Sequence, residues 1–318
     1  MPRIVYLLLY QGGLAGGHKM LFRHVETLCD LGFDAFCMTG SGSVTPNWFS
    51  HRAPLMPPQA LRPDDIVVIA DDASDALKLN ATRSERAVVF CQDPINFAAK
   101  SLDAMDLFPG AKFPTLMANS PSVAATLTRL YPHANVEMVP CFADDRLFGP
   151  ASEKCLEISY TPRKRPLEVA AIHGLFQRLY RSHERLAWNP LINCSEAEVA
   201  AEFGRSGLFL SLSRMESVGM TTLEAMASGC VCAGFRGVGG NSFASSENGF
   251  WAPDDDCVAA VDAIAEAADL YKTGGPGLSQ LTEASVETAR QWSYGRFRTT
   301  LEEVWMRIAP EARCRDRV

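Results

Sequence analysis

The segment LFLSLSRMESVGMTTLEAMASG, residues 208–229, places two glutamates around an expected helix start. Glu216 follows an apolar run with the pattern of a buried strand, and Glu224 stands one turn into the helix that begins near Gly219. A helix that begins at the carboxyl end of a parallel strand presents free N–H groups and the positive end of its dipole, which together bind phosphate. Gly219 has no side chain and lets such a ligand approach the backbone closely.

The side chains at this helix start indicate what else the ligand carries. The hydroxyls of Thr221 and Thr222, next to Met220, add hydrogen-bond donors for a phosphate. Two carboxylates would repel a bare phosphate, but they can accept hydrogen bonds from the neutral hydroxyls of a sugar ring and a ribose. The ligand indicated is therefore a nucleotide-diphosphate-sugar. The alternative is structural: Glu216 is a surface residue and Glu224 only stabilises its helix.

The same segment resembles the E-x7-E signature of glycosyltransferase family 4, the group 1 family of retaining glycosyltransferases with the GT-B fold, because seven residues separate Glu216 from Glu224. Two further segments resemble passages of that family and stand in the expected order: NSPSVAATLTRLYPHANVEMVPCFADDRLF at 119–148 and GGNSFASSENGFWAPDDDCVAAVDAI at 239–264. The resemblance implies that Glu216 faces the transferred sugar and that Glu224 binds the ribose hydroxyls.

Members of this family also use cations to stabilise the departing diphosphate, and the resemblance implies where they lie. Arg163, Lys164 and Arg165 follow the first expected strand of the second half, residues 156–160. Positive charge near the leaving oxygens stabilises the transition state without a metal ion. Because the family more often spaces its Arg and Lys several residues apart, the sequence leaves open which of the three contacts the diphosphate. A solvated basic turn is the structural alternative.

A glycine-rich segment, GGLAGGHK at residues 12–19, follows the first expected strand and opens the first expected helix. It does not match a Walker A loop, because a histidine precedes the lysine and a methionine follows it. The glycine spacing does not match a dinucleotide-binding fingerprint either. The family resemblance implies that Gly16 and Gly17 approach the donor phosphate or the acceptor, and plain turn glycines are the alternative.

We place the acceptor near His18 and near the motif Cys91–Gln92–Asp93–Pro94, which follows the fourth expected strand. Gln92 and Asp93 resemble a variant found in rhamnosyltransferase-like members of the family. Other members often carry a histidine near this position. This motif has none, so the role of that histidine is not assigned to any residue of this chain. Asp93 either binds an acceptor hydroxyl or caps the turn that follows it.

These residues stand in a chain that alternates short apolar runs with helical patterns, which is typical of a mainly parallel sheet covered by helices on both faces. Such sheets bind ligands beyond the carboxyl ends of their strands. The expected strands are residues 4–9, 35–38, 66–70, 87–91, 116–118, 136–139, 156–160, 167–172, 186–192, 208–212 and 231–235. The expected helices include 19–31 with Gly32 at its end, a helix begun by Ser120 and Pro121, 176–184, and an amphipathic segment at 285–308.

The alternation stops in the polar stretch of residues 141–154 and then restarts, which places a domain boundary there. We expect an α/β protein of two Rossmann-like domains with parallel sheets facing a central cleft, the GT-B arrangement. The N-terminal acceptor domain spans residues 1–145 and the C-terminal nucleotide-sugar donor domain spans 146–290. A C-terminal helix and tail at 291–318 pack back toward the N-terminal domain.

The composition of the 318-residue chain argues against several other classes of protein. Hydrophobic residues make up 47% and charged residues 21%, as in a soluble globular protein. The 30 Lys and Arg against 37 Asp and Glu leave a net charge of −7, which disfavours nucleic acid as the main partner. The 10 cysteines are scattered without a CxxC pair, which favours a reducing compartment over a disulfide scaffold. No segment reads as a membrane span or a signal peptide, so we expect a cytoplasmic protein, with peripheral contact at the inner face of a membrane left open.

The expected activity moves a hexosyl or deoxyhexosyl group from the nucleotide-diphosphate donor to a hydroxyl of a glycan or lipid-linked acceptor. Retention at the anomeric carbon and a role in surface glycan or polysaccharide synthesis follow from the family resemblance alone. We expect no metal ion and no cofactor, because the nucleotide-sugar is a co-substrate. Two alternatives stay open: a sugar-nucleotide epimerase of similar fold, and a non-catalytic protein that binds nucleotide-sugars or acts as a scaffold. The base, the sugar, the linkage and the oligomeric state are left open as well.

Overall fold

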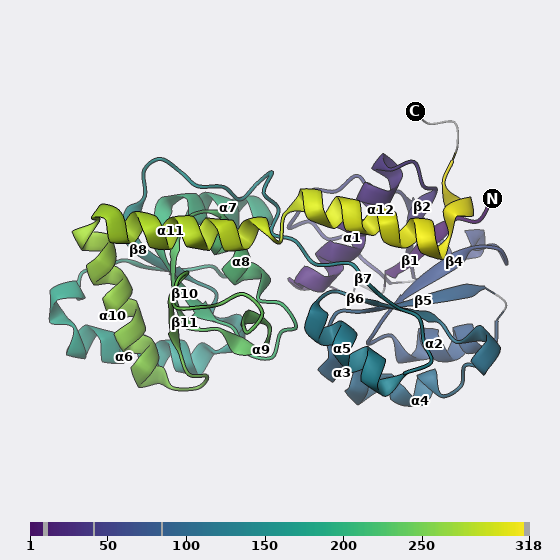
Figure 1. Cartoon of the computed structure of the whole chain (residues 1–318), viewed down its shortest axis with the longest axis horizontal. Helices are drawn as coiled ribbons and strands as arrows, with labels where there is room; N and C mark the ends of the chain where they lie inside the picture. The colour runs from purple at the N-terminus through teal and green to yellow at the C-terminus, as the bar shows by residue number, and fades with distance from the viewer. Residues whose placement is uncertain (9–11, 41, 84, 315–318) are drawn as a thin grey trace. The chain divides into compact units, whose positions relative to one another are not determined.

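The computed structural model describes residues 1–8, 12–40, 42–83 and 85–314. The chain forms two compact units, each built on its own parallel sheet (Figure 1). The first unit comprises Met1–Cys141 together with Phe297–Val318, and the second comprises Phe142–Arg296. The sequence places the boundary after residue 145 and a separate helix and tail at 291–318, whereas the first unit ends at Cys141 and includes the last helix.

The sheet of the first unit has seven parallel strands in the order β3-β2-β1-β4-β5-β6-β7. Its strands are β1 (Ile4–Leu8), β2 (Ala35–Thr39), β3 (Leu55–Met56), β4 (Ile66–Ala70), β5 (Arg86–Cys91), β6 (Thr115–Ala118) and β7 (Val136–Met138). The inner strands are continuous apolar runs because helices cover both faces of the sheet. Six of these strands are predicted from the sequence, and residue 9 of the first predicted strand lies outside the described residues. The two-residue β3 is too short to leave a pattern.

The helices of the first unit begin and end at residues that suit those positions. They are α1 (Gly16–Asp30), η1 (Pro58–Ala60), α2 (Ser74–Ala81), α3 (Pro94–Lys100), α4 (Leu102–Met105), η2 (Gly110–Lys112), α5 (Pro121–Leu130), α12 (Tyr294–Ile308) and η5 (Pro310–Ala312). The hydroxyl of Ser120 accepts a hydrogen bond from the N–H of Val123, and Pro121 occupies the first position of α5, as predicted. Gly32 has φ +85° just after α1, which confirms its predicted role at the end of that helix.

The last helix, α12, packs onto the sheet of the first unit, as the sequence predicts. Phe297 and Trp305 are fully buried on its inner face. The ring of Phe297 lies 5.0 Å from that of His24 on α1, and the ring of Trp305 lies 6.4 Å from that of Tyr6 on β1. Burial lowers the pKa of His24 to about 3, so its ring is neutral and forms a hydrogen bond of 3.0 Å with the Tyr6 hydroxyl. Aromatic packing therefore joins the end of the chain to its first strand.

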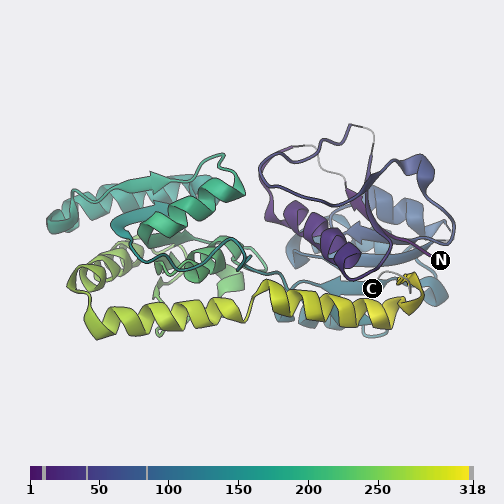
Figure 2. The same ribbon diagram turned by 90° about the horizontal axis from the view of Figure 1, so that it is seen from above.

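The amphipathic segment predicted at 285–308 is not one helix but two, α11 (Gly275–Arg290) and α12 (Figure 2). The N–H groups of residues 291–293 turn back to carbonyls three positions earlier, which tightens the last turn and ends α11. The N–H of Tyr294 then donates to Oδ1 of Asp145 at 2.7 Å, and α12 begins there. Apolar spacing runs across this break, so periodicity alone could not reveal it.

The second unit has a five-stranded parallel sheet in the order β12-β11-β10-β8-β9. Its strands are β8 (Cys155–Tyr160), β9 (Trp188–Pro190), β10 (Ser206–Leu212), β11 (Val231–Phe235) and β12 (Phe250–Ala252). Every residue of the central strand β10 is buried. The sequence predicts the first four of these strands, although β9 is shorter than the predicted run of 186–192.

The strand predicted at 167–172 is wrong, because these residues belong to α6 (Pro166–Leu179). Pro166 fits the first helical position, and the buried residues Val169, Ile172 and Phe176 recur at helical spacing. The apolar run was short, and a short apolar run does not distinguish a buried strand from a buried helix. The helix predicted at 176–184 is accordingly the end of α6 followed by the turn η4 (Arg181–His183).

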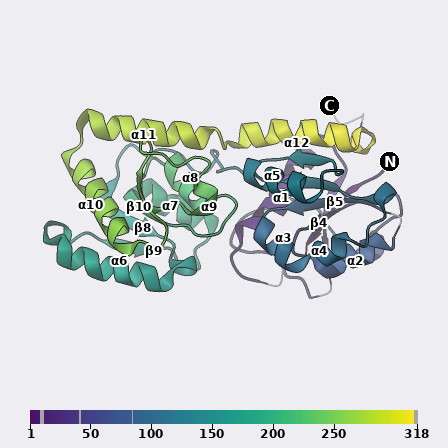
Figure 3. The same cartoon turned by 60° about the horizontal axis from the view of Figure 1, so that its bottom comes forward.

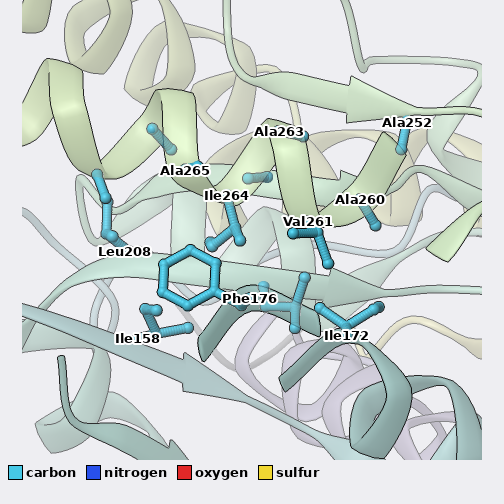
Figure 4. Packing of buried hydrophobic residues seen from close by; sticks show 14 of the residues in the cluster. Ile158, Ile172, Phe176, Leu208, Ala252, Ala260, Val261, Ala263, Ile264 and Ala265 are labelled. Carbon is cyan, nitrogen blue, oxygen red and sulfur yellow. The ribbon is translucent and has the colours of Figure 1, made fainter. Parts of the chain in front are cut away.

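Helices cover both faces of the second sheet. The remaining ones are η3 (Pro162–Lys164), α7 (Glu196–Arg205), α8 (Met220–Ala227), α9 (Gly237–Gly240) and α10 (Cys257–Thr273). On one face α6 and α10 lie side by side (Figure 3), and α7, α8 and α11 cover the other face. Ile172 and Phe176 of α6 meet Val261 and Ile264 of α10 in the core (Figure 4). This core supports the strands whose carboxyl ends carry the expected donor site.

Candidate functional site

The helix start after β10 lies where the sequence predicts it. The strand β10 ends at Leu212, a loop of residues 213–219 follows, and α8 begins at Met220 with Gly219 at the N-cap. Gly219 has no side chain that could cap this helix. The N–H of Met220 donates to the carbonyl of Val218 at 3.0 Å. The other first N–H groups of a helix have no partner within the helix, and such groups bind anions.

The hydroxyl of Thr222 faces the strands and is not turned toward the space beyond the helix. Its side chain is buried, and its Oγ1 lies 3.0 Å from Oγ of Ser211 and 3.4 Å from Oγ of Ser213. The hydroxyl of Ser211 in turn donates to the carbonyl of Phe235 on β11 at 2.6 Å. The hydroxyl predicted at position 222 is therefore part of a buried cluster that ties α8 to the sheet, whereas Thr221 is half-buried.

Two glycines allow α9 to pack directly on the loop that carries Glu216. A side chain at Gly237 would lie 2.8 Å from the carbonyl oxygen of Arg214, and one at Gly239 would lie 2.7 Å from that of Glu216. The N–H of Val238 also donates to the carbonyl of Arg214 at 2.8 Å. Gly237 and Gly239 thus let two backbone segments touch, because a side chain at either position would collide with the loop.

Glu216 forms an ion pair with Lys164, which comes from a different strand end. Their Oε1 and Nζ atoms lie 2.6 Å apart, and Oε2 accepts the N–H of Arg214 at 2.6 Å. Burial by itself would raise the pKa of the Glu216 carboxyl, but the charge and the hydrogen bond of Lys164 outweigh it and hold that pKa below its ordinary value. Glu216 is therefore ionised at neutral pH. The structure brings together these two predicted catalytic residues.

The other two cations of the basic turn differ sharply in their surroundings. Arg163 is exposed on η3. Arg165 is buried, its Nε donates to the carbonyl of Ser213 at 3.0 Å, and its guanidinium lies 4.4 Å above the ring of Phe235. It also forms an ion pair with Asp255. Among the three, Lys164 and Arg163 therefore present the more accessible charges.

Glu224 lies on α8 and is buried, with 6% of its surface exposed. The helix is buried on every side from Thr222 to Ala227, so Glu224 is enclosed by protein. A carboxylate in that position accepts hydrogen bonds only from groups that reach into the unit. The ribose role that the resemblance implies for Glu224 stays a prediction.

In the first unit, the predicted acceptor residues meet at the carboxyl ends of β1 and β5. Nε2 of Gln92 donates to the carbonyl of Gly17 at 3.3 Å, and a side chain at Gly17 would lie 3.2 Å from that amide. Gly16 begins α1 and is exposed. His18 is half-buried, and burial lowers the pKa of its ring below the ordinary value.

Asp93 caps α3, which is one of the two roles predicted for it. Its Oδ1 accepts hydrogen bonds from the N–H groups of Ile95 at 2.9 Å and Asn96 at 3.3 Å, and Pro94 fills the first helical position. The carboxylate is thus already used by its own helix. Its second predicted role, binding an acceptor hydroxyl, stays a prediction.

The sequence reasoning missed Asp71, which follows β4 and supports the Gln92–Asp93 turn. Its Oδ2 accepts the N–H groups of Gln92 at 3.0 Å and Asp93 at 2.7 Å. Burial raises the pKa of Asp71 to about 6 against the opposing effect of these hydrogen bonds. The signal in the sequence was an aspartate directly after an apolar strand, at the edge where parallel sheets bind ligands.

No group of three or more His, Cys, Asp or Glu side chains in residues 1–8, 12–40, 42–83 and 85–314 is placed to hold a metal ion. No helix in the same part of the chain is both long enough and apolar enough to cross a membrane.

Comparison with known proteins connects the second unit to a family. Residues 191–283 match the family model described as glycosyl transferases group 1, and this range includes the Glu216 loop and α8. The chain is also 28% identical over 132 residues to an alpha-1,6-glucosyltransferase of Actinobacillus pleuropneumoniae serotype 7 (strain AP76). That match spans 40% of this chain and 40% of the length of the relative.

Solved structures resemble the chain over nearly its whole length. Sucrose-phosphate synthase from Thermosynechococcus elongatus has a TM-score of 0.70 at 14% identity, covering 97% of this chain and 100% of that one. HepE of Anabaena in complex with UDP has a TM-score of 0.68 at 14% identity, with the same coverage of both chains. A glycosyltransferase from Rickettsia africae has a TM-score of 0.67 at 12% identity, covering 96% of this chain and 98% of that one. The two parallel-sheet units therefore have the GT-B fold that the sequence predicts.

Proposed function

We propose that this chain is a glycosyltransferase that transfers a hexosyl or deoxyhexosyl group from a nucleotide-diphosphate donor to a hydroxyl acceptor. The observation that carries the proposal is the uncapped start of α8, with the ion pair of Lys164 and Glu216 at the carboxyl ends of the same sheet. An anion site, a cation and a carboxylate that accepts hydrogen bonds are what a nucleotide-sugar requires. The group 1 family match, which includes Glu216 and α8, supports the proposal.

In the proposed donor complex, the backbone N–H groups of Gly219, Thr221 and Thr222 face the diphosphate. The N–H predicted at Met220 is not among them, because it donates to the carbonyl of Val218 at 3.0 Å. Glu216 accepts hydrogen bonds from the transferred sugar and Glu224 from the ribose. Because Lys164 holds the pKa of Glu216 low, that carboxylate accepts hydrogen bonds and does not act as an acid at neutral pH. Its role is to orient the sugar.

The proposed chemistry is electrostatic. As the bond between the anomeric carbon and the diphosphate breaks, negative charge grows on the leaving oxygens, and the charges of Lys164 and Arg163 stabilise it. This cation pair takes the place that a metal ion has in other transferases. We include retention at the anomeric carbon, metal independence and the absence of a cofactor in the proposal.

The proposed acceptor is a hydroxyl of a surface glycan or a lipid-linked sugar, which binds the first unit near Gly16, Gly17, His18, Gln92 and Asp93. The contact between Gln92 and Gly17 joins the loop after β5 to the start of α1 at one edge of the sheet, which supports a shared binding surface. We propose a cytoplasmic location with peripheral contact at the inner face of a membrane, where such acceptors are presented.

Binding of UDP tests the donor site first. Anabaena HepE has been solved in complex with UDP and with UDP-glucose, so these two are the first probes, followed by GDP, ADP and dTDP. A true ligand raises the melting temperature in proportion to the logarithm of its concentration. If none of the four nucleotides does so, the proposed donor site is wrong.

Product analysis with a radiolabelled donor then tests the reaction. Glycosyl transfer requires an acceptor and releases the nucleoside diphosphate. Conversion of the donor to a second nucleotide-sugar without an acceptor would indicate an epimerase instead. Binding without turnover under any acceptor condition would indicate a non-catalytic binding protein. Loss of transfer in Glu216→Ala, with binding of the nucleotide retained, supports the assigned role.

A further inference from the structure

The three neighbouring cations that follow β8 are not equivalent, and Arg165 stands apart from the other two. Its side chain is 1% exposed, whereas that of Lys164 is 34% exposed. A fully buried guanidinium keeps its charge and therefore requires compensating partners around it. What surrounds Arg165 decides whether it can bind a diphosphate.

Three separate segments contact the guanidinium of Arg165. Nε donates to the carbonyl of Ser213, at the start of the loop that carries Glu216, at 3.0 Å. Nη1 pairs with Asp255, and Nη2 lies 3.8 Å from Asp254, both in the turn that follows β12. Nη1 also lies 3.5 Å from Oε1 of Glu168 on its own helix, α6. Each of the three nitrogens of the Arg165 guanidinium therefore has a protein oxygen nearby.

The remaining surface of the guanidinium stacks on an aromatic ring. Its Cζ atom lies 4.4 Å above the centre of the Phe235 ring at the end of β11. Arginine stacks on aromatic rings and uses its planar fork for hydrogen bonds at the same time, which lysine cannot do. The site is therefore built for an arginine held in one orientation.

The acidic turn that receives Arg165 also reaches α9. Oδ1 of Asp254 accepts the N–H of Gly237 at 3.2 Å. Asp255 has φ +67°, a left-handed conformation that aspartate tolerates better than most residues. Arg165 consequently lies where the basic turn, the Glu216 loop and the acidic turn come together.

We propose that Arg165 is a positioning residue that holds Lys164 and the Glu216 loop in place and does not itself contact the diphosphate. The assignment rests on the proposed function, because it concerns the same donor site. Lys164 is its neighbour in the chain, and Ser213 stands three residues before Glu216. Fixing the Arg165 backbone and the Ser213 carbonyl restricts both partners of the Lys164–Glu216 pair. The sequence left open which of Arg163, Lys164 and Arg165 contacts the diphosphate, and the inference removes Arg165 from these candidates.

A double-mutant cycle distinguishes positioning from direct contact. The variants are Lys164→Gln, Arg165→Lys and the two combined, and the measured quantity is the ratio of the dissociation constants for uridine and UDP. This ratio isolates the diphosphate contribution and does not change when a variant merely loses some stability. Lys164→Gln is expected to lower the ratio about tenfold or more, because a charge-assisted hydrogen bond to phosphate is lost.

Arg165→Lys keeps the positive charge and is expected to lower the ratio several-fold in the wild-type background. If Arg165 acts through Lys164, the same change adds almost nothing when Lys164→Gln is already present. If the two effects multiply, Arg165 contacts the diphosphate independently and the inference is overturned. Circular dichroism and melting temperature confirm that each variant is folded.

A second variant covers the case in which Arg165→Lys does not fold. Combined Asp254→Asn and Asp255→Asn removes the two carboxylates while leaving Arg165 in place. If Arg165 contacted the diphosphate itself, its release from these competing carboxylates would make UDP bind more tightly. If Arg165 is a positioning residue, the loss of its two partners makes UDP bind more weakly. Tighter or unchanged binding therefore overturns the inference. Asp256→Asn is the matched control, since Asp256 caps α10 and asparagine caps equally well.

The failure of the proposed function has a different signature. If the wild-type protein binds none of UDP, GDP, ADP and dTDP, the proposed donor site is wrong, and the positioning role of Arg165 in that site is wrong with it. If the wild-type protein binds UDP and the cycle is multiplicative, the donor site stands and only the positioning role of Arg165 fails.

Discussion

Two helices of the first unit, α3 and α5, start differently from α8 of the second unit. In the first unit, Asp93 caps α3 and Ser120 caps α5, so the side chains of the protein itself satisfy the first N–H groups. In the second unit, α8 has Gly219 at the same position and no side-chain cap within the described chain. A capped start stabilises its own helix, whereas an uncapped start keeps its donors for a ligand.

The charged groups follow the same division. Near the capped helices, Asp71 and Asp93 accept backbone N–H groups and serve the local structure. Near the uncapped helix, Lys164 and Glu216 bond chiefly to each other across two strand ends and remain partly exposed. Around α8, partly exposed charged groups are therefore available for a ligand to recruit, and Glu216 and α8 lie within the residues that match the group 1 family model.

The largest expected effect comes from Glu216. Replacing it by Gln removes the charge that orients the sugar, and we expect kcat to fall by about 100-fold or more, with little change in melting temperature. Initial rates with UDP-glucose and acceptor measure this. The control is Glu287→Gln, an exposed glutamate on α11, which should leave kcat unchanged. Equal activity of Glu216→Gln and wild type would contradict the role of the Glu216 charge in the donor site of the second unit.

Lys164→Gln is expected to lower kcat/KM about 10- to 100-fold, because the leaving diphosphate loses a cation. The same change shifts the pH profile. Lys164 keeps the pKa of Glu216 below its ordinary value, so the ionised carboxylate persists to lower pH in the wild type. Without Lys164, burial dominates and raises that pKa, and the acid limb of kcat/KM moves to higher pH. If the acid limb of the kcat/KM profile stays at the same pH in Lys164→Gln, the effect of Lys164 on the pKa of Glu216 is contradicted.

Converting the uncapped helix into a capped one tests the comparison directly. Gly219→Asp supplies a capping carboxylate at the start of α8, and we expect UDP affinity to fall about tenfold while stability is kept or slightly raised. Isothermal titration and thermal melting give the two readouts. The reciprocal change, Ser120→Gly at α5, should cost a few tenths of a kcal/mol in stability and leave UDP binding intact. Loss of UDP binding in both variants would contradict the proposal that the start of α8 binds UDP whereas the start of α5 only stabilises its helix.

The smallest expected effect is the contribution of Asp71 to the pH dependence of the free energy of unfolding. Its folded-state pKa of about 6 lies above its ordinary 3.8, so the folded state binds the extra proton. Stability therefore falls as pH rises from about 4 to about 6 and is flat above that range. Asp71→Asn removes this slope, which urea unfolding at pH 4.5 and 7.5 measures. Asp72→Asn, at the half-exposed neighbour, should reduce the slope only in part, because burial raises the pKa of Asp71 more than the charge of Asp72 does.

Much of the fold could be predicted because parallel strands and helix starts leave local patterns. The strand before Glu216, the helix beginning at Gly219 and the Ser120–Pro121 start are each encoded in a few neighbouring residues. The error at 167–172 has the opposite cause. Whether a short apolar run becomes a strand or part of α6 depends on what it packs against, and no local pattern contains that information.

The sequence alone determined which residue types stand near the strand ends: two glutamates around a glycine-led helix, and three cations in a row. Only the tertiary structure decided how these groups are used. It paired Lys164 with Glu216, buried Arg165 beneath the acidic turn and turned the Thr222 hydroxyl toward Ser211. The physical reason is that charge pairing and burial depend on distances between segments far apart in the chain, and residue order does not specify those distances.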